Sequence, residues 1–125
     1  MSDLRPRGVP IELDGVERHF LFTLNVIDEL QETYGKNLYE VLEDLTQEGG
    51  SAPMLRSIVT FLLNQEAARN KRLGGPELPE VTEKDVGNMI GMDNYYDVLS
   101  AVLRAYGISM PEADEDEDPN GGSGQ

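Results

Sequence analysis

The stretch VPIELDGVERHFLFTLNVIDELQETYG, residues 9–35, decides the fold of this 125-residue chain. Two alternating runs flank Asp14-Gly15 at its start. Asp-Gly between alternating runs is the strongest short signal for a β-hairpin, because a type I′ turn needs two residues with positive φ. The predicted register is Leu13–Val16, Ile11–Arg18 and Val9–Phe20. We expect this largely apolar face to be buried.

The second run leads into the first of four or five predicted helices. Asn25 is a good N-cap for it, and Gly35 a good stop after Tyr34. Apolar spacing and capping signals predict further helices after Asn37, from Pro53 to about Arg72, from Thr82 to Ile90, and from an Asn94 cap to Gly107. The third is the most apolar and is expected to be central. Because a lone hairpin is marginal in water, we expect it to pack on these helices.

These elements predict a mainly α (α+β) fold, with an N-terminal β-hairpin packed on a bundle of four to five short helices. Residues 9–107 form the predicted single domain, with a loop at Glu48–Ser51. Residues 1–8 are predicted to form a flexible arm. Residues 108–125 are acidic and Gly-rich, which predicts a disordered tail.

Composition excludes several classes of function. The chain has no cysteine and one histidine, so disulfide scaffolds, thiol enzymes, iron–sulfur proteins and Cys- or His-rich metal sites are excluded. No apolar run is long enough to span a membrane. The formal charge of −14 repels phosphate backbones and anionic lipids, so we expect neither nucleic acid nor a membrane as partner. A basic protein partner remains compatible.

No group of residues predicts catalysis, a cofactor or a metal site. His19 falls on the strand face predicted to be exposed, the sequence fixes no carboxylate that would orient it as a base, and it is interpreted as a surface histidine. Asp116-x-Asp118-x-Asn120-Gly121 is similar to half of an EF-hand loop, but Pro119 interrupts it and no helices flank it. The basic group at Arg69–Arg72 complements a helix C-terminus. The chain is therefore interpreted as a non-enzyme.

Methionine and tyrosine side chains near the last helix supply the candidate partner-binding residues. An adaptable surface could be formed by Met89, Met92, Tyr95, Tyr96 and Met110. At helical spacing such residues can equally belong to the core. Met92 and Tyr96 fall outside the apolar stripe of the last helix, which makes them the stronger candidates.

Four segments together carry a resemblance to a known family. They are FLFTLNVIDELQETYGKNLYEVLEDL (20–45), MLRSIVTFLLNQEA (54–67), VTEKDVGNMI (81–90) and YDVLSAVLRAYG (96–107). With the preceding hairpin, their order resembles the tail assembly chaperones of long-tailed (siphovirus-like) phages and prophages. The likeness covers residues 9–107 and lies in apolar positions, caps and lengths.

The resemblance implies a non-enzymatic assembly factor in the host cell cytoplasm, absent from the mature virion. Such proteins bind the tape measure protein, keep it soluble and recruit tail tube protein subunits. Self-association is expected, and the hairpin offers an open edge for it. Two other classes remain open from the residues alone. One is an acidic helical adaptor or regulatory domain, and the other an inhibitor that mimics nucleic acid.

Overall fold

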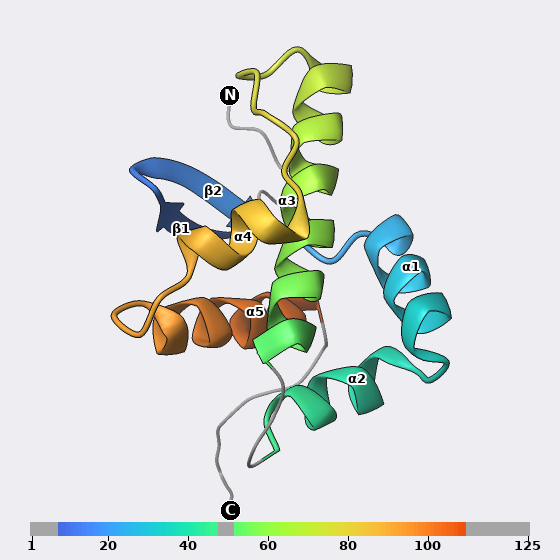
Figure 1. Ribbon diagram of the computed structural model, residues 1–125. Helices are drawn as coiled ribbons and strands as arrows, with labels where there is room; N and C mark the ends of the chain where they lie inside the picture. The colour runs from blue at the N-terminus through green and yellow to red at the C-terminus, as the bar shows by residue number, and fades with distance from the viewer. Residues whose placement is uncertain (1–7, 48–51, 110–125) are drawn as a thin grey trace, which may run out of the picture.

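The computed structural model describes residues 8–47 and 52–109. Its elements are β1 (Val9–Leu13), β2 (Val16–Phe20), α1 (Leu24–Tyr34), α2 (Leu38–Leu45), α3 (Ala52–Leu73), α4 (Glu83–Met89) and α5 (Tyr95–Ser109). In Figure 1, α3 stands at the centre, with the hairpin and α4 on one side and α1 and α2 on the other. The predicted fold class is confirmed, although α3, at 22 residues, is not a short helix.

The hairpin has the predicted register, with Val9 opposite Phe20 and Leu13 opposite Val16. Asp14 and Gly15 have φ values of 54° and 77°, as the expected turn requires. The pair that closes a two-residue turn is hydrogen-bonded, and pairing alternates from there. Pro10 and His19, which face each other, therefore point their backbone nitrogens outward. This is why β1 tolerates a proline at this position.

One face of the hairpin lies on the core, as predicted, but its composition differs at two positions. Val9, Leu13 and Phe20 are buried. Val16 was expected to be buried and is exposed, although Leu13 opposite it at the same turn is buried. Arg18 lies on the core face and is itself buried. A buried charge needs a partner, and this partner is described below with the polar network.

Gly8 packs closely against the end of β2. Its φ is 91°, and a Cβ placed on it would lie 2.4 Å from the carbonyl oxygen of Phe20. Residue 8 was predicted to belong to the flexible arm, whereas the structure describes it in this contact.

We predict that Gly8→Ala lowers the free energy of unfolding by about 1–3 kcal/mol, because positive φ and a backbone clash act together. Gly35→Ala is the matched control. Its φ is also positive, but nothing lies within 4 Å of an added Cβ. Urea unfolding of both variants measures the difference. Equal losses would show that the contact with Phe20 has no influence on stability.

Capping residues set the starts of α1 and α2. The predicted cap Asn25 is wrong: the Thr23 side chain accepts a hydrogen bond from Val26 N, and α1 begins two residues earlier than the Asn25 cap implies, at Leu24. Both residue types cap well, and with the earlier residue, Thr23, as its cap the helix gains Leu24 and Asn25 at its start. Asn37 caps α2 as predicted, in a reciprocal capping box with Glu40.

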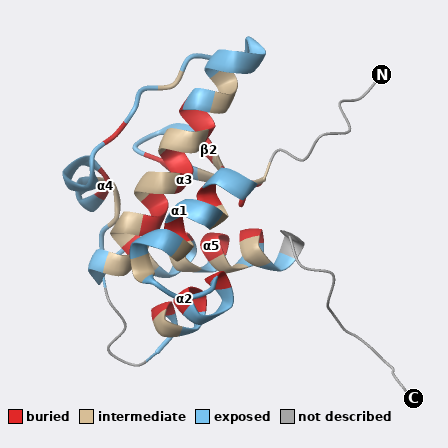
Figure 2. Cartoon of the chain, turned by 90° about the vertical axis from the view of Figure 1, so that its right-hand side faces the viewer, coloured by how far each residue is buried: buried red, intermediate tan, exposed pale blue. Residues whose placement is uncertain are grey.

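Helix α3 forms the centre of the core, as predicted. It contacts β2, α4 and α1, while α5 contacts both strands. Its buried apolar residues are Leu55, Ile58, Val59, Leu62, Leu63 and Ala67. All of these except Ala67 join residues of α1, α2, α5 and the hairpin in one hydrophobic cluster. Figure 2 shows the buried residues gathered on α3 and on the inner sides of the neighbouring helices.

Helices α4 and α5 partly follow the prediction. Thr82 and Asp85 form the expected capping box at the start of α4. The predicted stop at Gly107 is wrong, because α5 continues to Ser109. Glycine ends a helix where it adopts positive φ, and Gly107 is not among the glycines that do. The buried positions of α5 are Val98, Ala101, Val102 and Ala105.

Three predicted features lie outside the described residues: most of the arm, within residues 1–7, the loop at 48–51, and the tail from residue 110 onward. Within the part that the structure describes, no helix is long and apolar enough to cross a membrane.

Candidate functional site

An apolar groove lies where the start of α3 meets α4 and the beginning of α5. Its volume is about 340 Å³. The lining residues are Ala52, Leu55 and Arg56 of α3, Gly87 of α4, Ile90, Gly91 and Met92 of the following turn, and Tyr95 of α5. All but Arg56 present apolar or backbone surface. The groove can therefore accept apolar side chains from a partner.

Met92 and Tyr96 add exposed apolar surface beside this groove. Met92 is 94% exposed and Tyr96 is 76% exposed. The Tyr96 ring packs edge-on against Tyr95, with ring centroids 5.3 Å apart. Two large apolar side chains that are this exposed beside an apolar groove make the patch a candidate interaction surface.

The Asn94 side chain shapes the turn that presents Met92. Its Oδ1 accepts a hydrogen bond from Gly91 N at 2.7 Å, and its Nδ2 donates to the Met89 carbonyl at 3.0 Å. The sequence predicted that this side chain would cap α5. Instead the Asn94 carbonyl accepts the hydrogen bond from Val98 N at the start of α5, while its side chain bonds to the preceding turn. The side chain bonds backward, and so it holds the turn closed between α4 and α5.

Among the residues that the structure describes, Arg56 is the one charged residue that lines the groove. Its side chain crosses α4 at Gly87, where an added Cβ would lie 3.2 Å from Arg56 Cδ. Its Nε lies 3.8 Å from Glu83 Oε1, too far for a hydrogen bond. Among the described residues, Arg56 Nε is the buried side-chain nitrogen without a hydrogen-bond partner.

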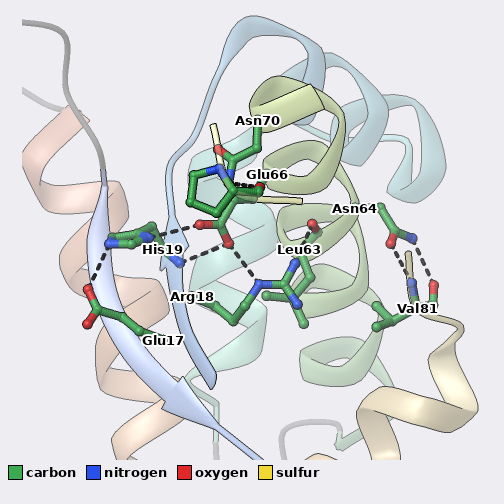
Figure 3. A network of polar contacts seen from close by, with 9 residues as sticks. Glu17, Arg18, His19, Leu63, Asn64, Glu66, Asn70 and Val81 are labelled. Atoms are coloured by element: carbon green, nitrogen blue, oxygen red, sulfur yellow. Dashed lines mark hydrogen bonds and ion pairs between the residues drawn. The ribbon is translucent and has the colours of Figure 1, made fainter. Parts of the chain in front are cut away.

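A second site, which is polar, is centred on Glu66 and joins β2 to α3 (Figure 3). Glu66 Oε1 accepts from Arg18 Nε and from His19 N, each at 3.0 Å. Arg18 Nη2 also donates to the Leu63 carbonyl. Arg18 and Glu66 are each only 3% exposed.

Arg69 lies near this network on α3. Burial lowers the pKa of Arg69, and the nearby negative charge of Glu66 opposes this effect.

The structure corrects the interpretation of His19 as a surface histidine without an orienting carboxylate. Its Nδ1 lies 2.8 Å from Glu66 Oε2, and its Nε2 lies 3.1 Å from Glu17 Oε2. The ring is half-buried. Carboxylates engage both ring nitrogens, so the contacts hold the ring in place and leave neither nitrogen free toward a substrate. The arrangement fastens β2 to α3.

Polar side chains also hold the segment that leads to α4. Asn64 Oδ1 accepts from Val81 N at 2.7 Å, and Asn64 Nδ2 donates to the Val81 carbonyl at 2.9 Å. Farther along α3, Asn70 Nδ2 donates to the Pro76 carbonyl. Together these bonds hold residues 76–81, which follow α3, alongside that helix. They position α4, and with it one wall of the groove.

The structure brings the sequence candidates together to different degrees. Met92 and Tyr95 line the groove, and Tyr96 adjoins it through Tyr95. Met89 is half-buried and packs on the core, while Met110 lies outside the described residues. The sequence analysis missed the contribution of α3, including Arg56. Across residues 8–47 and 52–109, no cluster of three or more His, Asp or Glu is placed to hold a metal ion.

No family model, curated protein or solved structure matches this chain. The interpretation of the site therefore rests on its own chemistry. The groove offers an apolar floor, two exposed apolar side chains and one guanidinium. Such a surface can hold the apolar face of a partner helix.

Proposed function

We propose that this protein is a non-enzymatic phage tail assembly chaperone. In this role it binds the tape measure protein, keeps it soluble and recruits tail tube protein in the host cell cytoplasm, and it is absent from the mature virion. The observation that carries the proposal is the apolar groove flanked by Met92 and Tyr96. The family resemblance of residues 9–107 supplies the identity of the client.

The physical requirements of such a chaperone agree with the charge of this chain. A long helical client exposes apolar stripes that must be covered until assembly, and a groove between helices is a common way to cover them. The complex must also stay soluble. The formal charge of −14 favours solubility by mutual repulsion between molecules.

Co-expression with a tape measure protein and a tail tube protein, whose genes the proposal places beside this one, tests the proposal. We expect the chain to retain one or both in a pull-down at low and moderate salt, and to raise the soluble fraction of the tape measure protein. If neither protein binds, the proposal fails, and the chain is better described as an acidic helical adaptor.

A pair of matched variants tests whether the groove is responsible. The groove variant is Met92→Ser with Tyr96→Ser. The control variant is Leu24→Ser with Tyr39→Ser, which removes two large exposed apolar side chains on α1 and α2. We expect the groove variant to lose most of the retained client and the control variant to keep it, because hot-spot residues dominate binding. Equal loss in both variants would contradict a specific groove.

A further inference from the structure

We infer that the groove takes a basic amphipathic helix of a partner protein, with an apolar residue seated between α3 and α5 and lysine or arginine side chains on the acidic surface around it. This inference rests on the proposed function, since it names the chemistry of the client segment.

The volume of the groove limits what can enter it. At about 340 Å³ it lies at the small end of the range for ligand pockets, which is about 300–1,000 Å³. That space suits one or two large side chains rather than a whole helix. The rest of the partner must lie across Met92 and Tyr96, which stand exposed beside the opening. An amphipathic helix has this form, with apolar residues along one face.

The charges near the groove favour a basic partner. On α4, the turn after it and the start of α5, the exposed charged residues are Glu83, Lys84, Asp85, Asp93 and Asp97. Four of the five are acidic. Arg56 and Lys84 are the opposing cations, and the Glu83 carboxylate, 3.8 Å from Arg56 Nε, offsets part of the Arg56 charge. An acidic partner would meet repulsion at this surface, whereas a basic one gains attraction during encounter.

A pair of synthetic peptides tests the inference without any phage protein. The first carries leucine at i, i+3, i+4 and i+7 spacing with lysine elsewhere, and the second has glutamate in place of lysine. We expect the lysine peptide to bind and to shift the NMR signals of the Met92 methyl group and the Tyr96 ring. The groove variant should weaken binding at least tenfold, and the control variant should leave it unchanged.

Charge variants test the electrostatic part. Asp93→Asn with Asp97→Asn should weaken binding of the lysine peptide about two- to fivefold, as expected for exposed charge pairs. Arg56→Gln should strengthen it by a similar factor, because it removes a cation that opposes the peptide. Asp28→Asn with Glu29→Gln, on exposed positions of α1, is the matched control and should have a smaller effect.

The outcomes separate this inference from the proposed function. Equal binding of the two peptides, or undiminished binding of the lysine peptide to the groove variant, would overturn the inference. Failure of the phage pull-down together with groove-dependent peptide binding would overturn the proposed client and leave the inference standing. Retention of the tape measure protein by the groove variant would overturn the inference and leave the proposed client standing.

Discussion

Replacing Glu66 by leucine should lower the free energy of unfolding by about 3–5 kcal/mol, the usual loss when one partner of a buried ion pair is removed. The change keeps a side chain of similar size but removes every acceptor for Arg18 Nε and His19 N. Arg18 would then be a buried charge without its carboxylate. Urea unfolding followed by circular dichroism measures the loss.

Two further variants identify the cause of that loss. Arg18→Met combined with Glu66→Leu should be more stable than Glu66→Leu alone, because an apolar pair can replace a buried ion pair at little cost. Glu17→Gln, at an exposed position that also contacts His19, should change stability by less than about 1 kcal/mol. If the double variant is no more stable than the single one, the buried charge of Arg18 is not the reason for the loss.

Replacing Leu62 by alanine should lower the free energy of unfolding by about 2–5 kcal/mol, because it opens a cavity in the centre of the core. Leu62 is 1% exposed and lies on the helix that contacts β2, α4 and α1. The surrounding elements are fastened to α3 by polar contacts and can collapse only partly into the space. Thermal and urea unfolding both report this loss.

Leu73→Ala is the matched control for the cavity. It removes the same atoms from the same helix, but Leu73 is exposed at the last position of α3. The expected loss is below about 1 kcal/mol, as for surface substitutions in general. A loss below about 1 kcal/mol for Leu62→Ala as well would contradict the central position of α3.

The features that local hydrogen bonds determine could be predicted from the sequence. The Asp14-Gly15 turn sets the hairpin register, and the capping boxes at Asn37 and Thr82 set the starts of two helices. Where two local signals compete, the sequence alone decides poorly. Thr23 caps α1 in place of Asn25, and Gly107 is incorporated into α5.

The polar network had a signal that the sequence analysis did not use. Arg18 occupies a core-facing position of β2, and Glu66 continues the buried stripe of Leu55, Val59 and Leu62 by one turn. A charge at a core position implies an opposite charge nearby, so the two could have been paired. Their separation of 48 positions hides the contact from any local pattern.

Only one side of the groove could be predicted. Met92 and Tyr96 stand outside the apolar stripe of α5, and this marked them as candidates. The opposite wall comes from Ala52, Leu55 and Arg56, more than thirty positions earlier in the chain. The groove exists because the segment after α3 returns along that helix and places α4 beside its start. No periodicity within one helix encodes this arrangement.

The outward backbone groups of the hairpin bear on aggregation. A two-stranded sheet has two outer edges that can template strands from other molecules. On β2, Glu66 takes the His19 N–H, and on β1, Pro10 has no N–H while Glu12 adds a charge. Strand addition to either edge therefore meets fewer free N–H donors than a bare hairpin would offer. We expect concentrated protein to resist strand-to-strand growth more than a hairpin whose outward N–H groups are all free.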